Sequence, residues 1–315
     1  MYTQTYMSNI GDKEIEQAVI ISGLSGYTGK YKELGGGEIN DTFKLELEDR
    51  SVILRISKHK DQNSLYREAR VLSKINHNRI PKLIFFDTEK TILDRQWIVE
   101  DYIAGEAVKR LNKKQFESLG ELLAVVHETE SRGTDNNLWE TLLSNCKTFG
   151  DEEFHLNHPS LKLKTLVHKM RAYCNDWQPK FADVPSVLVH GDATPSNVLV
   201  QGDDTALIDW ELTSYRDAMS EFSTIYYEDM EFNQGKWRIQ IRPEEKQALF
   251  EGYIAGGGII DEDRITFWMN HDKMGAALFL YWRIHDSGRA ADSEQMQQYQ
   301  LDLDNLILSL EKNLA

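Results

Sequence analysis

The spacing of apolar residues changes along the chain and predicts a β-rich first part. Residues 42–47 and 51–56 alternate between apolar and polar side chains on either side of a polar turn, which is the pattern of an antiparallel hairpin. Short apolar runs favour two further strands, and spacings of three to four residues favour two helices. The strands are expected at 82–86 and 96–100, and the helices at 11–24 and 63–76.

Beyond about residue 105 the apolar residues recur every three or four positions, which indicates amphipathic helices. The clearest case is 113–129, where Phe116, Leu119 and Val126 share one face. A compact β segment at 186–209 interrupts this helical part. The remaining helices are expected at 160–176, 243–255, 263–286 and 292–313.

The length of 315 residues is comfortable for two lobes. We therefore expect an α+β protein. Its small N-terminal lobe, residues 1–104, holds an antiparallel β-sheet with one main helix, and its larger lobe, residues 105–315, is mostly helical. A monomer and a homodimer are both compatible with this pattern.

Composition narrows the classes of partner. The chain has 36 Lys and Arg against 51 Asp and Glu, a net charge of −15. Binding to nucleic acid or to an anionic membrane needs clustered basic residues, so neither is expected. The acidic balance leaves room for a cationic ligand, although it also serves solubility alone.

Cysteine usage and the N-terminus favour the cytoplasm. Cys146 and Cys174 lack metal-ligand spacing and are expected to be reduced core thiols. Residues 1–10 are polar, without the apolar stretch of a signal segment, and no apolar run approaches the roughly 20 residues of a membrane span.

The β segment carries the sharpest chemical signal. An apolar strand ends at His190, and a polar loop then presents Asp192 and, five residues later, the amide of Asn197. A short hairpin returns to Asp209 at the end of another apolar strand. Carboxylate and amide oxygens suit Mg²⁺, and phosphoryl transfer uses such a metal with a carboxylate near the attacking hydroxyl.

The motif His-Gly-Asp-x-x-x-x-Asn followed by Ile-Asp-Trp resembles the catalytic and metal-binding loops of the aminoglycoside phosphotransferase and choline kinase superfamily. The resemblance implies a bilobal protein-kinase-like fold with a nucleotide-clamping first lobe and a catalytic, acceptor-binding second lobe. It implies that Asp192 is the base and that Asn197 and Asp209 bind Mg²⁺. His190 resembles the loop histidine that supports the catalytic geometry.

Upstream residues fit the same resemblance. Gly36 and Gly37 precede Asn40 as in the family's Gly-Gly-x-x-Asn loop, which covers the phosphates of ATP. Glycines let backbone N–H groups approach phosphate closely, although such a run also marks simple turns. Arg55 on the expected strand at 51–56, paired with Glu68, resembles the cation that contacts the phosphates. A surface arginine on an edge strand is the simpler alternative.

The run from Val99 to Gly105 resembles the family's hinge, where backbone groups near Asp101 and Ile103 would face adenine. Apolar side chains would enclose the ring, and ordinary core packing explains the same residues. The expected members are Ile53, Leu199 and Ile208. Downstream, Asp217 fits the family pattern, but Glu221 stands where an aspartate is usual.

The acceptor is the least defined part of the prediction. Acidic and aromatic residues of the last ninety positions could hold a cation, although core packing and solvated charges explain them equally well. The candidates are Glu228, Asp229, Trp282 and Asp286.

The resemblance implies an ATP- and Mg²⁺-dependent kinase of a small hydroxylated molecule, with GTP left open as the donor. An aminoglycoside-type antibiotic kinase is favoured. A choline, ethanolamine, homoserine or sugar kinase is the alternative, and a non-catalytic kinase-fold binding protein is the alternative of another class. A protein kinase is disfavoured because no activation segment ending in Ala-Pro-Glu is recognisable.

Overall fold

Two compact units make up the chain. The structure, a computed structural model, describes residues 10–34, 40–58, 64–87, 89–92, 94–134, 137–232, 238–287 and 293–315. The first unit combines Met1–Glu106 with Ala206–Thr213, and the second combines Ala107–Thr205 with Ser214–Ala315. The chain first passes from the first unit to the second after Glu106, two residues beyond the predicted boundary after residue 104. The return of Ala206–Thr213 to the first unit was not predicted, and this segment carries Asp209.

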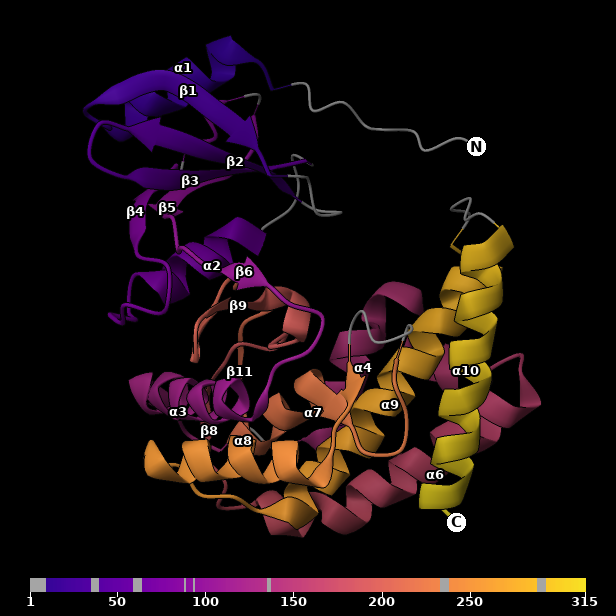
Figure 1. The fold of residues 1–315 in the computed structure, drawn as a ribbon. Coiled ribbons are helices and arrows are strands. Elements are labelled where there is room, and N and C mark those ends of the chain that lie inside the picture. The colour runs from indigo at the N-terminus through magenta and orange to yellow at the C-terminus, as the bar shows by residue number, and fades with distance from the viewer. Residues whose placement is uncertain are drawn as a thin grey trace. The chain divides into compact units, whose positions relative to one another are not determined.

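The first unit is built on a five-stranded antiparallel sheet with the strand order β1-β2-β3-β5-β4 (Figure 1). Each predicted strand of the first lobe is present, and β1 is additional. The strands are β1 (Tyr27–Glu33), β2 (Asn40–Leu47), β3 (Ser51–Ser57), β4 (Leu83–Phe86) and β5 (Trp97–Asp101), and the helices are α1 (Asp12–Ser22) and α2 (Ser64–Leu72).

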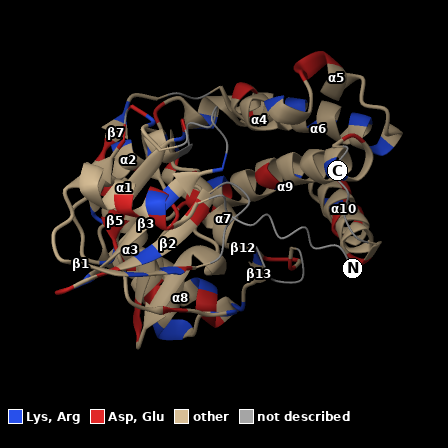
Figure 2. Ribbon diagram, turned by 90° about the horizontal axis from the view of Figure 1, so that it is seen from above, with Lys and Arg blue, Asp and Glu red and all other residues tan. Residues whose placement is uncertain are grey.

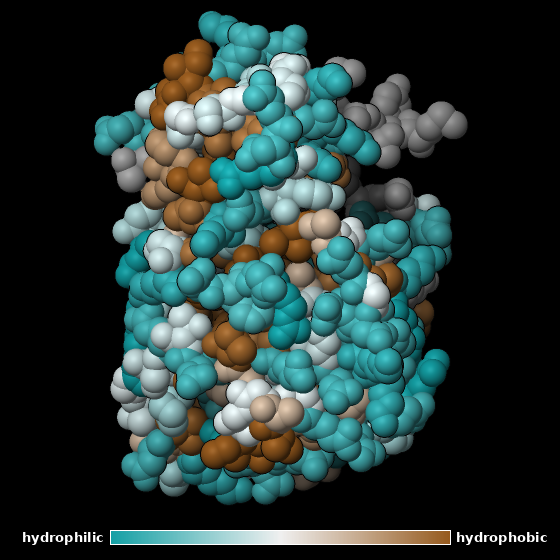
Figure 3. Space-filling model, turned by 60° about the vertical axis from the view of Figure 1, so that its left-hand side comes forward, coloured by the Kyte–Doolittle hydropathy of each residue, from teal (hydrophilic) through white to brown (hydrophobic). Residues whose placement is uncertain are grey.

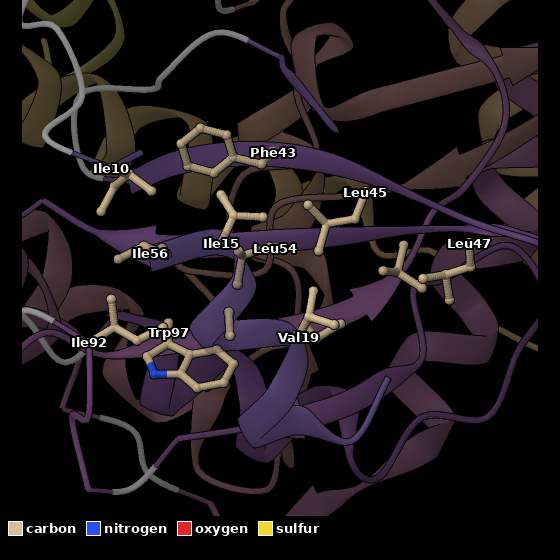
Figure 4. Packing of buried hydrophobic residues seen from close by; sticks show 13 residues of the cluster. Ile10, Ile15, Val19, Phe43, Leu45, Leu47, Leu54, Ile56, Ile92 and Trp97 are labelled. Carbon is tan, nitrogen blue, oxygen red and sulfur yellow. The ribbon is translucent and has the colours of Figure 1, made fainter. Parts of the chain in front are cut away.

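The two faces of this sheet are covered by different helices. Ile15 and Val19 of α1 point toward Phe43, Leu45 and the other apolar residues of one face (Figure 4). On the opposite face, apolar residues of α2 pack against Ile98 of β5. Strand β3 is therefore buried on both faces, which explains why its sequence reads as a nearly continuous apolar run.

Helix α2 ends earlier than the apolar pattern predicted. It stops at Leu72, whereas the prediction ran to residue 76. The hydroxyl of Ser73 bonds to the carbonyl of Arg70, and the chain continues as a turn that still buries Ile75. A buried apolar residue in a turn thus extended the helical pattern beyond the helix.

The second unit is mostly helical. The predicted long helices are present within about one residue at each end, and α4, α5 and α7 are additional. The helices are α3 (Lys113–Thr129), α4 (Leu138–Cys146), α5 (Glu152–Leu156), α6 (Leu161–Trp177), α7 (Phe222–Ile225), α8 (Pro243–Ala255), α9 (Glu262–His285) and α10 (Ser293–Asn313). Both cysteines are free and buried, as expected.

Short strands of this unit position the polar loops. They form three small sheets with the orders β11-β8-β7, β10-β9-β6 and β12-β13. The boundary between the units falls inside β6 and inside β10. The strands are β6 (Glu106–Ala107), β7 (Ser131–Arg132), β8 (Ser186–Val189), β9 (Val198–Gln201), β10 (Asp204–Leu207), β11 (Ser214–Arg216), β12 (Tyr226–Tyr227) and β13 (Ile239–Gln240).

The face drawn in Figure 3 is mostly hydrophilic, and its hydrophobic patches are separated by polar residues. Large apolar side chains that remain exposed, such as Ile254 and Ile259, are few among the described residues. No helix in the part of the chain that the structure describes is long and apolar enough to cross a membrane.

Helices α3 and α8 lie side by side and approach closely at glycines (Figure 1). A β-carbon added at Gly252 would come within 1.9 Å of the Glu117 carbonyl oxygen, and one added at Gly120 within 2.1 Å of the Leu249 carbonyl oxygen. Both neighbours are helix backbone, which cannot move aside without repacking the pair.

Gly252→Ala should therefore lower the free energy of unfolding by roughly 2 kcal/mol or more through overpacking. Gly275→Ala in α9 is the matched control, because its added carbon meets nothing closer than 3.8 Å. Alanine favours a helix over glycine by about 1 kcal/mol, so the control should be neutral or stabilising. Urea unfolding of both variants compares the effects, and equal stabilities would contradict the packing account.

Candidate active site

The loop after β8 brings Asp192 and Asn197 together in the second unit. The Asn197 side-chain N–H groups donate to the Asp192 backbone oxygen at 2.9 Å and to its carboxylate oxygen Oδ2 at 2.7 Å. Because Nδ2 is turned toward Asp192, the amide oxygen Oδ1 points the other way. An amide oxygen in that orientation is a suitable ligand for Mg²⁺.

The buried carboxylate of Glu221 anchors the backbone of this loop. Glu221 is fully buried, and its carboxylate accepts the backbone N–H groups of His190 and, at 3.1 Å, of Gly191. Burial alone would raise the pKa of Glu221, but the neighbouring His127 and the His190 N–H outweigh burial and lower it. Glu221 is thus an ionised anchor, which resolves the departure from the family pattern noted in the sequence.

The other residues of the loop are fixed in the same way. His190 is fully buried, and its ring nitrogen Nδ1 accepts the N–H of Asp192 at 3.2 Å. Gly191 has φ +80°, a left-handed conformation that side chains disfavour. The N–H of Ala193 donates to the Thr224 hydroxyl at 3.2 Å. The ring of His190 thus supports the backbone at Asp192, and the predicted role of this histidine in the catalytic geometry stays a prediction.

The first unit presents a second polar cluster around Arg55. Its guanidinium bonds to Glu68 of α2 through Nη1 and to Asp209 through Nη2 at 2.7 Å. The same Glu68 oxygen accepts the N–H of Trp210 at 3.1 Å, which ties the segment that follows β10 to α2. Asp209 itself has φ +65°, a strained conformation that in proteins concentrates at functional sites.

Carboxylates outnumber the cation in this cluster. Glu211 lies 3.9 Å from Arg55, and Glu100 of β5 is buried nearby. Burial, then the charge of Glu68, raises the pKa of Glu100 to about 8. Burial opposes the charge of Arg55, but Glu68, Asp209 and Glu100 outweigh it and raise the Arg55 pKa. The surplus of negative charge would be offset by a bound cation.

Several oxygens of the first-unit cluster are orphaned. Buried Glu68 Oε2, Glu100 Oε2 and Asn40 Oδ1 have no hydrogen-bond partner among the described residues, while Asn40 Nδ2 donates to Glu211 at 2.8 Å. Unsatisfied buried oxygens are costly unless a ligand completes them. The donor set, oxygen only, fits a hard cation such as Mg²⁺. The described residues contain no group of three or more His, Cys, Asp and Glu that could form an all-protein metal cage.

The structure places the predicted site residues in both units. Asn40, Arg55, Glu68 and Asp209 lie together in the first, and Asp192, His190 and Asn197 lie together in the second. Gly36 and Gly37 lie outside the described residues.

The predicted adenine-binding residues are divided between the units. Ile53 and Ile208 belong to the first unit and Leu199 to the second. The N–H of Asp101 is used within the sheet, where it donates to the Lys82 carbonyl at 2.9 Å, and half-buried Ile103 follows the end of β5. Of the two predicted hinge groups, the Asp101 N–H is thus already bonded.

The four acceptor candidates have internal partners. Lys246 bonds to Glu228 at 2.6 Å, and Figure 2 shows acidic and basic residues interspersed along α8, which carries this lysine. Asp229 accepts from buried Lys273 at 2.7 Å and from Ser309 at 2.6 Å. Trp282 packs against Phe149 and Phe279, and Asp286 is the C-cap of α9. These contacts do not bring the four together.

An antiparallel sheet with its flanking helices, followed by a mostly helical unit that carries this loop, is the architecture of the protein-kinase-like fold. The sequence model of the phosphotransferase enzyme family matches residues 30–268. The chain belongs to this family, and it is a phosphotransferase.

Relatives within this fold act on different acceptors. Homoserine kinase of Zymomonas mobilis is 24% identical over 209 residues, which cover 62% of this chain and 60% of the relative, so the match spans less than two thirds of it. Spectinomycin phosphotransferase, solved with ADP and spectinomycin, has 16% identity and a TM-score of 0.63 over 96% of this chain and 99% of its own. Plasmodium vivax ethanolamine kinase has 16% identity and a TM-score of 0.65 over 100% and 94%.

Glu221→Gln tests the anchor of the loop. An amide presents an N–H group to one of the two backbone donors, so the loop should shift. A displacement of about 1 Å at a reacting group can cost on the order of 100-fold in rate. We expect kcat to fall by that order with nucleotide affinity unchanged, measured by steady-state kinetics and nucleotide titration. Glu245→Gln, which alters a carboxylate bonded to Arg110, is the control. An unchanged kcat in the first variant would remove Glu221 from this role.

Proposed function

We propose that the protein transfers the γ-phosphoryl group of ATP to a hydroxyl of a small molecule. The Asp192–Asn197 pair carries this proposal. The Asn197 amide holds the Asp192 carboxylate, and the loop that carries both is anchored through backbone N–H groups. In-line phosphoryl transfer needs a base and a metal ligand fixed in this way. Family membership supports the reaction class.

The residues of each unit have distinct roles in this proposal. Asp192 orients the acceptor hydroxyl and accepts its proton as the oxygen attacks phosphorus. Arg55 binds the phosphates of ATP, held in place by Glu68. Asn197 and Asp209 would hold Mg²⁺, which when bound neutralises phosphate charge. Positioning and charge neutralisation then account for most of the acceleration.

A small metabolite is favoured over a polycationic antibiotic as the acceptor. Binding a polycation needs carboxylates that are free to pair with it, yet Glu228 and Asp229 are both engaged with lysines. The relatives include kinases of homoserine and ethanolamine as well as of an antibiotic, so the family alone leaves the acceptor open. The ion pairs of this chain therefore support the metabolic alternative.

A non-catalytic binding protein would not need this loop. Such a protein could lose the base or the metal ligands without loss of function, whereas Asp192, Asn197 and Asp209 are all present. The buried anchor Glu221 also keeps the loop in one conformation. These features support an active enzyme.

Asp192→Asn should lower phosphoryl transfer by about 1,000-fold or more, since a positioned base contributes roughly 100- to 10,000-fold. ATP binding should persist because Arg55 and Asp209 are untouched. Transfer of label from γ-³²P-ATP to acceptor, with ATP affinity measured in parallel, checks both parts. Asp203→Asn, which alters an exposed carboxylate paired with Lys114, should leave transfer intact. Near-normal transfer by Asp192→Asn would refute the assigned base.

A further inference from the structure

A fixed arginine is linked through helix α7 to the loop of the candidate base in the second unit. Arg238 precedes β13, and its Nε donates to the backbone oxygen of Ser223 at 2.6 Å. The next residue of α7, Thr224, accepts the N–H of Ala193 in the catalytic loop. One short helix therefore holds both Arg238 and the residue that follows Asp192.

Arg238 is also paired with a carboxylate of α9. Its Nη2 donates to Asp272 Oδ2 at 2.5 Å, and the Tyr227 hydroxyl donates to the same oxygen at 3.2 Å. The guanidinium lies over the Tyr227 ring, 5.0 Å from its centroid. These contacts define the orientation of the guanidinium plane.

The side chains of Arg238 and Asp272 are partly exposed and can contact a ligand. About 13% of the Arg238 side chain and 33% of the Asp272 side chain stay exposed. The bonds that Arg238 makes to the described residues use Nε and Nη2, and none uses Nη1. A guanidinium with a remaining N–H pair is suited to a carboxylate or phosphate oxygen.

The position of Arg238 relative to the base has an electrostatic consequence. Burial opposes its charge, but Asp272, Tyr227 and Asp192 outweigh burial and raise the pKa of Arg238. The charge of Arg238 therefore acts on the loop that carries Asp192 as well as on its partner Asp272.

We propose that Arg238 and Asp272 select an acceptor that carries a carboxylate and an ammonium group beside its hydroxyl, namely a small hydroxy amino acid. The inference rests on the proposed function, because it needs Asp192 to face the acceptor hydroxyl. The carboxylate binds Arg238 and the hydroxyl reaches Asp192. The ammonium binds Asp272 through Oδ1, because the bonds from Arg238 and Tyr227 both go to Oδ2. A matched pair of opposite charges suits a zwitterion and disfavours a polycation, whose second charge would lie near Arg238.

Homoserine and two compounds that each lack one of its charged groups test the selection. Homoserine carries both charges, 4-hydroxybutyrate lacks the ammonium group, and 3-amino-1-propanol lacks the carboxylate. Serine and threonine extend the panel to shorter hydroxy amino acids. Homoserine or one of these should have a higher kcat/KM than either truncated compound, and 3-amino-1-propanol should be the poorest of its set. Preferred transfer to 3-amino-1-propanol, choline or spectinomycin would overturn the inference.

Arg238→Gln separates ligand binding from a purely structural role. A hydrogen-bonded charge contact is worth on the order of 100-fold, so kcat/KM for the amino acid should fall by that order. The value for 3-amino-1-propanol should hardly change, so the ratio between the two compounds collapses. Arg238→Lys should recover part of the ratio. Arg110→Gln is the matched control, because Arg110 also binds one carboxylate and one backbone carbonyl.

The outcomes distinguish failure of the proposed amino-acid selectivity from failure of the proposed kinase function. If Arg238→Gln lowers activity equally toward all acceptors, or leaves the ratio intact, Arg238 is structural and the inference fails while the kinase remains. If an enzyme that binds Mg²⁺-ATP phosphorylates no hydroxy amino acid of the panel, the inference also fails. If no compound receives phosphate and ATP does not bind, the proposed function itself fails.

Discussion

The buried guanidinium of Arg55 is the contact on which the candidate nucleotide site depends. It joins strand β3 to helix α2 through Glu68 and to the segment after β10 through Asp209. Without it, several carboxylates would face one another in a buried place, where like charges repel strongly and each loses its hydration. The same arginine leaves the cluster short of positive charge. Stability and ligand binding are thus coupled in one set of residues.

The loop at 190–197 is held in the opposite way, because one anion, Glu221, accepts hydrogen bonds from neutral backbone N–H groups. Glu221 collects backbone N–H groups from the loop, and His190 and Thr224 collect others. Backbone N–H groups cannot rotate away as side chains can, so the loop is defined by bonds that few substitutions of its own residues remove. Each of the two clusters is therefore held by hydrogen bonds within its own unit, which favours catalysis by positioning.

Periodicity predicted most of the elements that bury an apolar face. Strand β1 was missed because it is an edge strand whose side chains are mostly exposed. Helix α4 was missed although it has the same length as α2, which was predicted, and also buries one face. The motif made Asp192, Asn197 and Asp209 candidates, because all three lie at short fixed spacings within one stretch of the sequence. The roles of Glu221 and Arg238 were not predictable, because their partners come from distant segments: Ser223, Asp272 and the loop at 190–192. Contacts of that kind leave no local pattern.

Calorimetric titration of ATP in the presence and absence of Mg²⁺ tests the central claim most directly. Near Arg55, the carboxylates of Glu68, Asp209 and Glu211 outnumber the single cation, so the phosphates of ATP meet more negative than positive charge. The account predicts tight binding only with Mg²⁺, and loss of that dependence in Asp209→Asn. Equal affinity for ATP with Mg²⁺ and with a chelator would contradict it.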